Sequence, residues 1–270
     1  MRIVLCSLLL LFIWLFPSTI EAKKSKGLVL CTWNIGHFSN GSQPYSLINV
    51  NDYKNSLKLY RSLVYNELRP DVIAINEYNR VFCGDDTLDN NFLTSLLLFN
   101  DFDNLIIGPY HYWGIRNAIF SKIKMKNSRL MYFESHKTTN GDDFVRSRDN
   151  YYIESDLYVD GKKVKLVCLH LLFSWKVTEV YQRKQMEELI NRYKDIDRII
   201  MCGDWNTETY SSLKNAGYIF ANDGSLKTFP SKGYALDNIV VKGLEISDVR
   251  MIKTDLSDHY PLVCRISLKN

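Results

Sequence analysis

Short apolar runs recur along almost the whole chain, and this repetition restricts the fold more than any other feature of the sequence. The runs have the length and composition of buried strands and lie at 28–33, 72–76, 151–159, 164–170, 198–202, 234–241 and 260–268. Residues 160–161, Asp-Gly, predict a hairpin turn. Two stretches, 52–68 and 176–193, show the period of amphipathic helices, and Pro70 ends the first. This mixture favours an α/β sandwich over an all-parallel sheet.

The composition is that of a globular protein. Of the 270 residues, 46% are hydrophobic and 24% are charged, which excludes a polar low-complexity chain, a collagen and a multi-span membrane protein. The formal net charge of +4 neither requires nor excludes a polyanionic partner. The length accommodates one large domain or two small ones.

The N-terminus has the features of a secretory signal. Arg2 precedes an apolar run at 3–16, which is too short to span a bilayer comfortably and suits the core of a signal peptide. Ala22 offers a cleavage point, so we expect a signal peptide at 1–22 and a functional domain at 23–270. An uncleaved anchor is the alternative. No other segment is apolar enough to span, which predicts a secreted or periplasmic protein without a stable membrane span after cleavage.

The cysteines do not form a recognisable framework. Five of the six lie beyond residue 22, and an odd count at irregular spacing does not indicate paired disulfides. The sequence contains no CxxC pair of the kind found in thiolate zinc sites. Cys31, Cys168, Cys202 and Cys264 lie in apolar runs and are predicted to be buried as small hydrophobic residues.

Polar side chains stand at or near the ends of the apolar runs, and they are the main indication of function. They are Asn34, Glu77, His170, Asp204, Asn206, Asp237, Asp258 and His259. Each has a structural explanation when taken alone, such as a turn, a cap or an exposed strand end. Asp237 is the hardest to explain in this way, because a carboxylate inside an apolar run needs a partner. A structural salt bridge is the alternative for that residue.

Taken together, these side chains predict the hydrolysis of a phosphate ester. They are carboxylates, amides and imidazoles, and the chain lacks a G-x-S-x-G nucleophile motif. Carboxylate and amide oxygens suit Mg²⁺ or Mn²⁺. A buried Asp beside a His fixes the imidazole tautomer and raises its basicity. A metal can then neutralise phosphate charge while the imidazole takes a proton from the attacking water.

Seven motifs resemble those of the endonuclease/exonuclease/phosphatase superfamily, the DNase I-like metal phosphoesterases. They are TWNIG (32–36), INE (75–77), RNAIFSK (116–122), CLHL (168–171), CGDWN (202–206), LDNIVV (236–241) and SDHYP (257–261). They occur in the family's order over nearly the whole mature chain, and GDWN and SDHYP are the most specific. The resemblance implies a four-layer αββα sandwich, in which two packed mixed β-sheets are flanked by helices and the site lies at one edge of the sheets.

The resemblance also implies roles for the catalytic residues. His259 is the general base or a stabiliser of phosphate charge, and Asp237 pairs with it. Asp204 orients the water or handles the leaving group. His170 donates to phosphate oxygens, and Asn206 is the neighbouring phosphate contact.

Metal and substrate residues follow from the same resemblance. Glu77 is the principal metal ligand, with Asn34 near the metal and Asp258 as a second metal-associated carboxylate. Asn76 stands where the family usually has Gln. The substrate-binding candidates are Asn117 and Arg148, although Arg146 is equally near in sequence to the second of these positions.

The substrate is the least determined feature. Substrate choice lies in loops at 36–51, 78–91 and 138–150, of which the last two are acidic, and aromatic residues at 111–113 and 175 could stack on bases or insert into lipid. The run YALDNIV lacks the PxWxDR pattern of inositol phosphatases. We expect a secreted, monomeric, Mg²⁺- or Mn²⁺-dependent phosphodiester hydrolase, with an endonuclease acting on nucleic acid favoured. The alternatives are a phospholipid or small-molecule phosphodiesterase or phosphatase of the sphingomyelinase type, and a binding domain without turnover.

Overall fold

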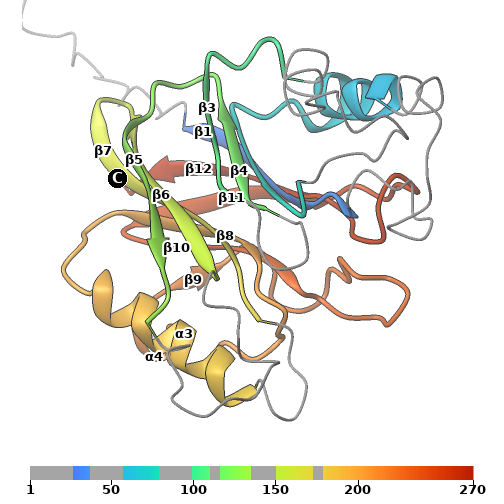
Figure 1. The fold of residues 1–270 in the computed structure, drawn as a ribbon. Coiled ribbons are helices and arrows are strands. Elements are labelled where there is room, and N and C mark those ends of the chain that lie inside the picture. Colours follow the sequence, from blue (N-terminus) through green and yellow to red (C-terminus); the bar gives the residue numbers. More distant parts are fainter. Residues whose placement is uncertain are drawn as a thin grey trace, which may run out of the picture.

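The computed structural model describes residues 27–36, 57–78, 99–109, 116–134, 150–172 and 179–269. Within them, two six-stranded mixed β-sheets pack against each other, and helices cover the outer face of each sheet (Figure 1). This architecture confirms the predicted four-layer αββα sandwich. The signal segment predicted at 1–22 and Cys83 lie outside the described residues. Among the helices described, none has the length and apolar character needed to cross a bilayer.

The strands divide between the sheets as follows. The first sheet has the order β11-β12-β1-β2-β4-β3 and consists of β1 (Leu28–Asn34), β2 (Val72–Asn76), β3 (Asn104–Ile107), β4 (Ala118–Ser121), β11 (Leu244–Met251) and β12 (Leu262–Leu268). The second has the order β5-β6-β7-β8-β10-β9 and consists of β5 (Lys126–Tyr132), β6 (Tyr151–Val159), β7 (Lys162–His170), β8 (Ile199–Asp204), β9 (Ile219–Phe220) and β10 (Asp237–Lys242).

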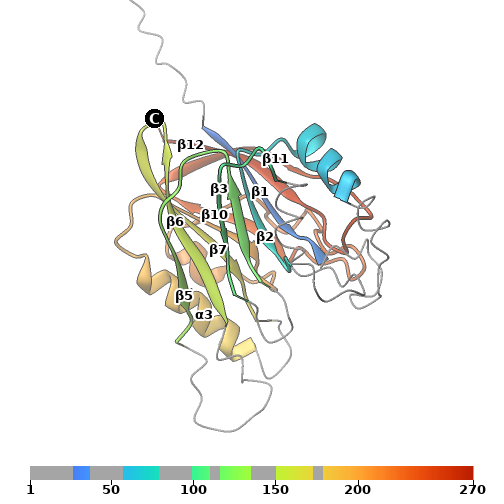
Figure 2. The ribbon, with the colours of Figure 1, turned by 45° about the horizontal axis from the view of Figure 1, so that its top comes forward.

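Each sheet contains one parallel pair of strands, and these two pairs position the site. β1 and β2 lie side by side in Figure 2, with Asn34 opposite Asn76 at their carboxyl ends. β7 and β8 form the other pair, which ends with His170 opposite Asp204. The Asn34 side chain donates a hydrogen bond to Asp204, so the carboxyl ends of both pairs meet at one edge of the sandwich.

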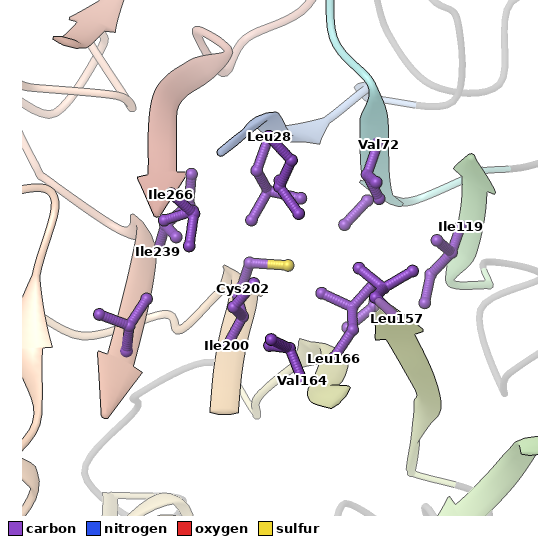
Figure 3. Packing of buried hydrophobic residues seen from close by; sticks show 14 of the residues in the cluster. Leu28, Val72, Ile119, Leu157, Val164, Leu166, Ile200, Cys202, Ile239 and Ile266 are labelled. Atoms are coloured by element: carbon purple, nitrogen blue, oxygen red, sulfur yellow. The ribbon is translucent and has the colours of Figure 1, made fainter. Parts of the chain in front are cut away.

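Apolar side chains from both sheets form the inner core. Figure 3 shows Leu28, Val72 and Ile119 of the first sheet facing Leu166 and Ile200 of the second. The inner core also contains three of the four cysteines predicted to be buried, whereas Cys31 faces the outer core of the first sheet. All four are free thiols. Their burial is as predicted, and it raises the pKa of Cys168 and Cys264 to about 12.

Helices close the outer faces. Helical residues 57–62 continue into a π-helix, η2 (Leu63–Leu68), which packs on the first sheet. It ends where predicted, because Arg69 adopts a left-handed conformation and Pro70 follows. Arg250 of β11 donates to the last carbonyls, those of Glu67 and Leu68. On the second sheet lie α3 (Glu179–Arg192), in the region predicted to be helical, and the short α4 (Ser211–Asn215).

Two strand boundaries near the site differ from the expected ones. β10 begins at Asp237 instead of 234, because Tyr234 folds back to form an isolated bridge with Phe229. β12 begins at Leu262 instead of 260, since the preceding residues form a turn in which the His259 amide donates to Ser257 Oγ. As a result, Asp237 is the first residue of its strand, and His259 lies in the turn that precedes β12.

The backbone at Gly203 is the tightest point beside the site. Gly203 has a φ of +144°, and a Cβ built on it would lie 1.9 Å from the Leu169 carbonyl oxygen. We expect Gly203→Ala to lower the free energy of unfolding by at least about 2 kcal/mol, since both backbone strain and steric overlap oppose it. Denaturant unfolding measures this loss. Gly161→Ala is the control, because its φ is +77° but nothing lies within 4 Å of its added Cβ. Equal losses in the two variants would show that steric overlap at Gly203 is unimportant.

Candidate active site

Asn34 joins the two sheets at the edge where the parallel pairs end. Its side-chain Nδ2 donates to Glu77 Oε1 at 3.1 Å and to Asp204 Oδ2 at 3.0 Å. Its Oδ1 accepts from the Gly36 amide at 3.1 Å, which fixes the amide orientation. Glu77 directly follows β2 with a φ of +55°. One buried amide therefore holds two carboxylates from different sheets beside each other.

Asp237 and His259 form a buried pair. His259 Nδ1 lies 2.8 Å from Asp237 Oδ2, so the contact predicted between these residues is present. The ring packs against Phe229, with centroids 4.7 Å apart. The His259 carbonyl accepts from Trp33 Nε1 at 3.0 Å, which fixes the backbone as well as the ring. The Asp carboxylate thus selects the orientation of the imidazole and directs its Nε2 away from Asp237.

Asp204 lies at the centre of the group. Its Oδ2 is 3.6 Å from His170 Nε2 and 3.9 Å from His259 Nε2. Its Oδ1 accepts from the Asn206 amide at 2.8 Å, and Asn206 has a left-handed φ of +51°. Asp237 is its cross-strand partner on β10. Two imidazoles and two carboxylates therefore lie close together, with Asp204, Asp237 and His259 buried and His170 half-buried.

Burial and neighbouring charge shift the protonation equilibria of this group. Burial alone would lower the pKa of His259, but the charge of Asp237 and its hydrogen bond to the ring, together with Asp204, outweigh burial and raise the pKa to about 10. Burial, followed by the charge of Asp237, raises the pKa of Asp204, although His259 and His170 act in the opposite direction. In the protein without a bound cation, a protonated His259 ring offsets the charge of the carboxylates at neutral pH.

The donor atoms of the site suit a divalent cation. Asp204, Asp237 and His259 each offer one ligand atom, and these atoms lie within 4.8 Å of one another. Asp237 Oδ2 and His259 Nδ1 are, however, hydrogen-bonded to each other, which fits an orienting pair better than two ligands. The carboxylates of Glu77 and Asp204 are held together by Asn34 and are hard oxygen donors of the kind that Mg²⁺ and Mn²⁺ prefer. Bringing two such carboxylates together favours a cation between them.

The structure brings most of the predicted site residues together. Asn34, Glu77, His170, Asp204, Asn206, Asp237 and His259 are linked by the contacts described above. Asp258 is exposed beside His259, and its Oδ1 lies 3.3 Å from Ser257 Oγ. The Ser257 hydroxyl donates to the Asn34 carbonyl, so Asp258 stands at the rim of the site.

The structure does not bring the predicted substrate-binding residues into this group. Asn117 is buried, with its Oδ1 accepting from Asn76 and its Nδ2 donating to the Tyr151 carbonyl, so its amide is engaged within the protein. Arg148 and Arg146 lie outside the described residues, as do most residues of the three predicted substrate loops.

Two buried amides near the site were not predicted to be functional. Asn76 hydrogen-bonds across the sheets, and its only sequence signal is that it stands where the resembling family has Gln. Gln182 of α3 donates to the carbonyl oxygens of Leu172, Trp205 and Asn206 and so holds the loop after β8. A Gln in a polar helix gives no sequence signal for such a role.

Part of the chain is similar in sequence to curated proteins. No family model matches the chain. UPF0294 proteins of Vibrio vulnificus are 34% identical to it, over 124 residues in strain CMCP6 and 121 residues in strain YJ016. The first match covers 42% of this chain and 42% of the relative, and the second covers 40% and 41%. The chain therefore matches only about two fifths of the length of these curated relatives.

Solved structures extend the likeness to nearly the whole chain. An endonuclease/exonuclease/phosphatase from Beutenbergia cavernae has a TM-score of 0.69 at 14% identity, covering 90% of this chain and 72% of that one. The human Nocturnin catalytic domain with bound sulfate has a TM-score of 0.62 at 17% identity, covering 90% and 94%. D. rerio TDP2 complexed with a single-strand DNA product has a TM-score of 0.61 at 17% identity, covering 90% and 99%. This chain has the endonuclease/exonuclease/phosphatase fold, which confirms the resemblance at the level of the fold.

Proposed function

We propose that the chain is a divalent-cation-dependent phosphodiester hydrolase and that its substrate is nucleic acid. The observation that carries this proposal is the buried Asp237–His259 pair, whose second ring nitrogen faces Asp204 at the point where Asn34 links Asp204 to Glu77. An oriented imidazole next to clustered hard oxygen donors is suited to phosphate ester cleavage.

The protein's own residues have separable tasks in this reaction. Asp237 holds the His259 ring, so that Nε2 can donate a proton to a phosphate oxygen or exchange one with the attacking water. The raised pKa of His259 favours the protonated, donating form in the absence of a cation. Asp204 lies within reach of a water placed between the two imidazoles, and its carboxylate can orient that water. His170 adds a second imidazole beside the same carboxylate.

The cation would be held by Glu77 and Asp204, with Asp258 at the rim. When bound, Mg²⁺ or Mn²⁺ supplies Lewis-acid stabilisation of the charge on the non-bridging phosphate oxygens. Asn34 keeps the two inner carboxylates in place for it, because both of its N–H groups are directed at carboxylate oxygens.

Removal of divalent cations is expected to abolish turnover. An excess of EDTA should lower the rate of diester hydrolysis to that of the buffer, because without a cation the clustered carboxylates of Glu77 and Asp204 repel the phosphate and its charge lacks Lewis-acid stabilisation. Added Mg²⁺ or Mn²⁺ in excess over the chelator should restore the rate, and circular dichroism of the EDTA-treated protein controls for unfolding. Full activity in EDTA would contradict a cation-dependent mechanism.

A substrate panel tests the proposed function itself. Plasmid DNA, RNA, sphingomyelin and inositol phosphates are each incubated with the protein and Mg²⁺. The TDP2 structure with its DNA product, and the apolar run that predicts export, support cleavage of external nucleic acid. Cleavage of sphingomyelin alone would contradict a nuclease and would support the alternative, a phosphodiesterase that acts on phospholipid. If folded protein binds Mg²⁺ but cleaves none of these substrates, the result supports the alternative of a binding domain without turnover.

A further inference from the structure

Asn76 is a buried amide between the two sheets, and each polar group of its side chain has a partner. It is fully buried at the end of β2. Its Oδ1 accepts from the Asp204 backbone N–H at 2.8 Å. Its Nδ2 donates to the Leu169 carbonyl and to Asn117 Oδ1, both at 2.8 Å. One side chain of the first sheet is therefore bonded to both strands of the parallel pair in the second.

These bonds differ in kind from the apolar packing that makes up the inner core between the sheets. The inner core is apolar, and apolar contacts are non-directional, so they tolerate small sliding of one sheet over the other. Hydrogen bonds specify distance and angle. Two of the bonds of Asn76 end on Asp204, a residue of the site, and on Leu169, the residue before His170.

We propose that Asn76 is a positioning residue, which sets the place of Asp204 relative to Asn34, Glu77 and the two imidazoles. The inference rests on the proposed function, because its kinetic consequence requires turnover. Asp204 comes to the site from the second sheet, whereas Asn34 and Glu77 come from the first. Asn76 lies opposite Asn34 in the register of β1 and β2. The hydrogen bond from the Asp204 amide to Asn76 therefore fixes the position of β8 relative to these two strands at the site.

Close packing makes the arrangement specific. A Cβ on Gly203, the residue before Asp204, would lie 3.2 Å from Asn76 Oδ1 and 1.9 Å from the Leu169 oxygen. The peptide that carries the Asp204 N–H thus fits directly against the Asn76 amide. A shorter side chain at position 76 cannot reach that N–H. The backbone of Asp204, which its neighbours in the second sheet also hold, then loses its hydrogen bond to the first sheet.

The kinetic test compares Asn76→Ala and Asn76→Ser with Ser121→Ala. Ser121 is equally buried and hydrogen-bonded, but lies at the opposite end of the same sheet, paired with Val72. We expect both position-76 variants to lower kcat about 10- to 100-fold with KM within about threefold, because a displaced catalytic group affects the reaction more than substrate binding. Ser121→Ala should keep kcat within about twofold.

Asn76→Ser keeps the test valid if Asn76→Ala does not fold, since a hydroxyl leaves the buried position polar. Asn76→Gln, which retains the amide on a longer stem, should recover at least about fivefold in kcat over the alanine variant. Folded Asn76→Ser with kcat within twofold of the unmodified chain would overturn the proposal. So would equal kcat losses at positions 76 and 121, which would indicate a general effect of stability.

Amide hydrogen exchange separates this inference from the proposed function. Measured by NMR, the Asp204 amide should be protected in the unmodified chain and in Ser121→Ala, and should exchange at least about tenfold faster in Asn76→Ser. The Ile200 amide, on the same strand, serves as the internal reference. If the unmodified chain hydrolyses no diester, the proposed function fails, while the exchange result still decides whether Asn76 holds Asp204. Unchanged Asp204 protection in Asn76→Ser would overturn the positioning role.

Discussion

His259→Ala is expected to lower kcat for diester hydrolysis by at least about 100-fold, the usual scale for an acid–base group. The ring is held by Asp237 on one side and faces Asp204 on the other, so its removal takes away the proton-exchanging group and the partner of a buried carboxylate. Steady-state kinetics with Mg²⁺ measure the loss.

His259→Asn is the matched control for folding. Its side-chain amide can still donate toward Asp237, which limits the cost of leaving that carboxylate unpaired, but it cannot exchange a proton. Both variants should be almost inactive, with the asparagine variant the more stable in thermal unfolding. A loss of less than threefold in folded His259→Asn would remove the imidazole from the mechanism.

Asp204→Asn should also lower kcat by at least about 100-fold. The substitution keeps the shape of the side chain but removes the negative charge that faces His170 and His259. It also places an N–H donor where Asn34 now donates to a carboxylate oxygen. Because burial raises the pKa of Asp204, the neutral amide removes the cost of burying a charge, which opposes the loss of the Asn34 hydrogen bond in the free energy of unfolding.

Asp156→Asn provides the comparison for Asp204→Asn. Asp156 is a buried carboxylate of β6 whose Oδ1 lies 2.6 Å from Lys165 Nζ, toward the opposite end of the second sheet. This variant should lose stability but keep kcat within about twofold. If Asp204→Asn keeps more than a third of the unmodified kcat, its carboxylate does not take part in the reaction.

Several of the strands predicted from sequence are buried on both faces. β2 and β8 consist of apolar residues in continuous runs, because one face meets the inner core and the other meets a helix layer. The edge strands β5 and β11 were not predicted. Most side chains of KNSRLMY and LEISDVRM are exposed, so neither segment carries the pattern that burial imposes.

The site could be predicted where its residues interrupt or end apolar runs. Asp237 and Asp204 were found in this way, because a carboxylate next to a buried strand needs a reason to be there. Asn76 and Gln182 were not found as functional candidates. Their amides bond to backbone groups of strands and loops distant in sequence, and such partners exist only after the sheets have packed.

Hydrolysis of nucleic acid by the unmodified chain, compared with His259→Asn purified in the same way, is the most direct test of the whole account. We expect Mg²⁺-dependent cleavage by the unmodified chain and almost none by the variant, a difference that also excludes a contaminating nuclease. Equal cleavage by both preparations, or none by folded protein with either Mg²⁺ or Mn²⁺, would contradict it.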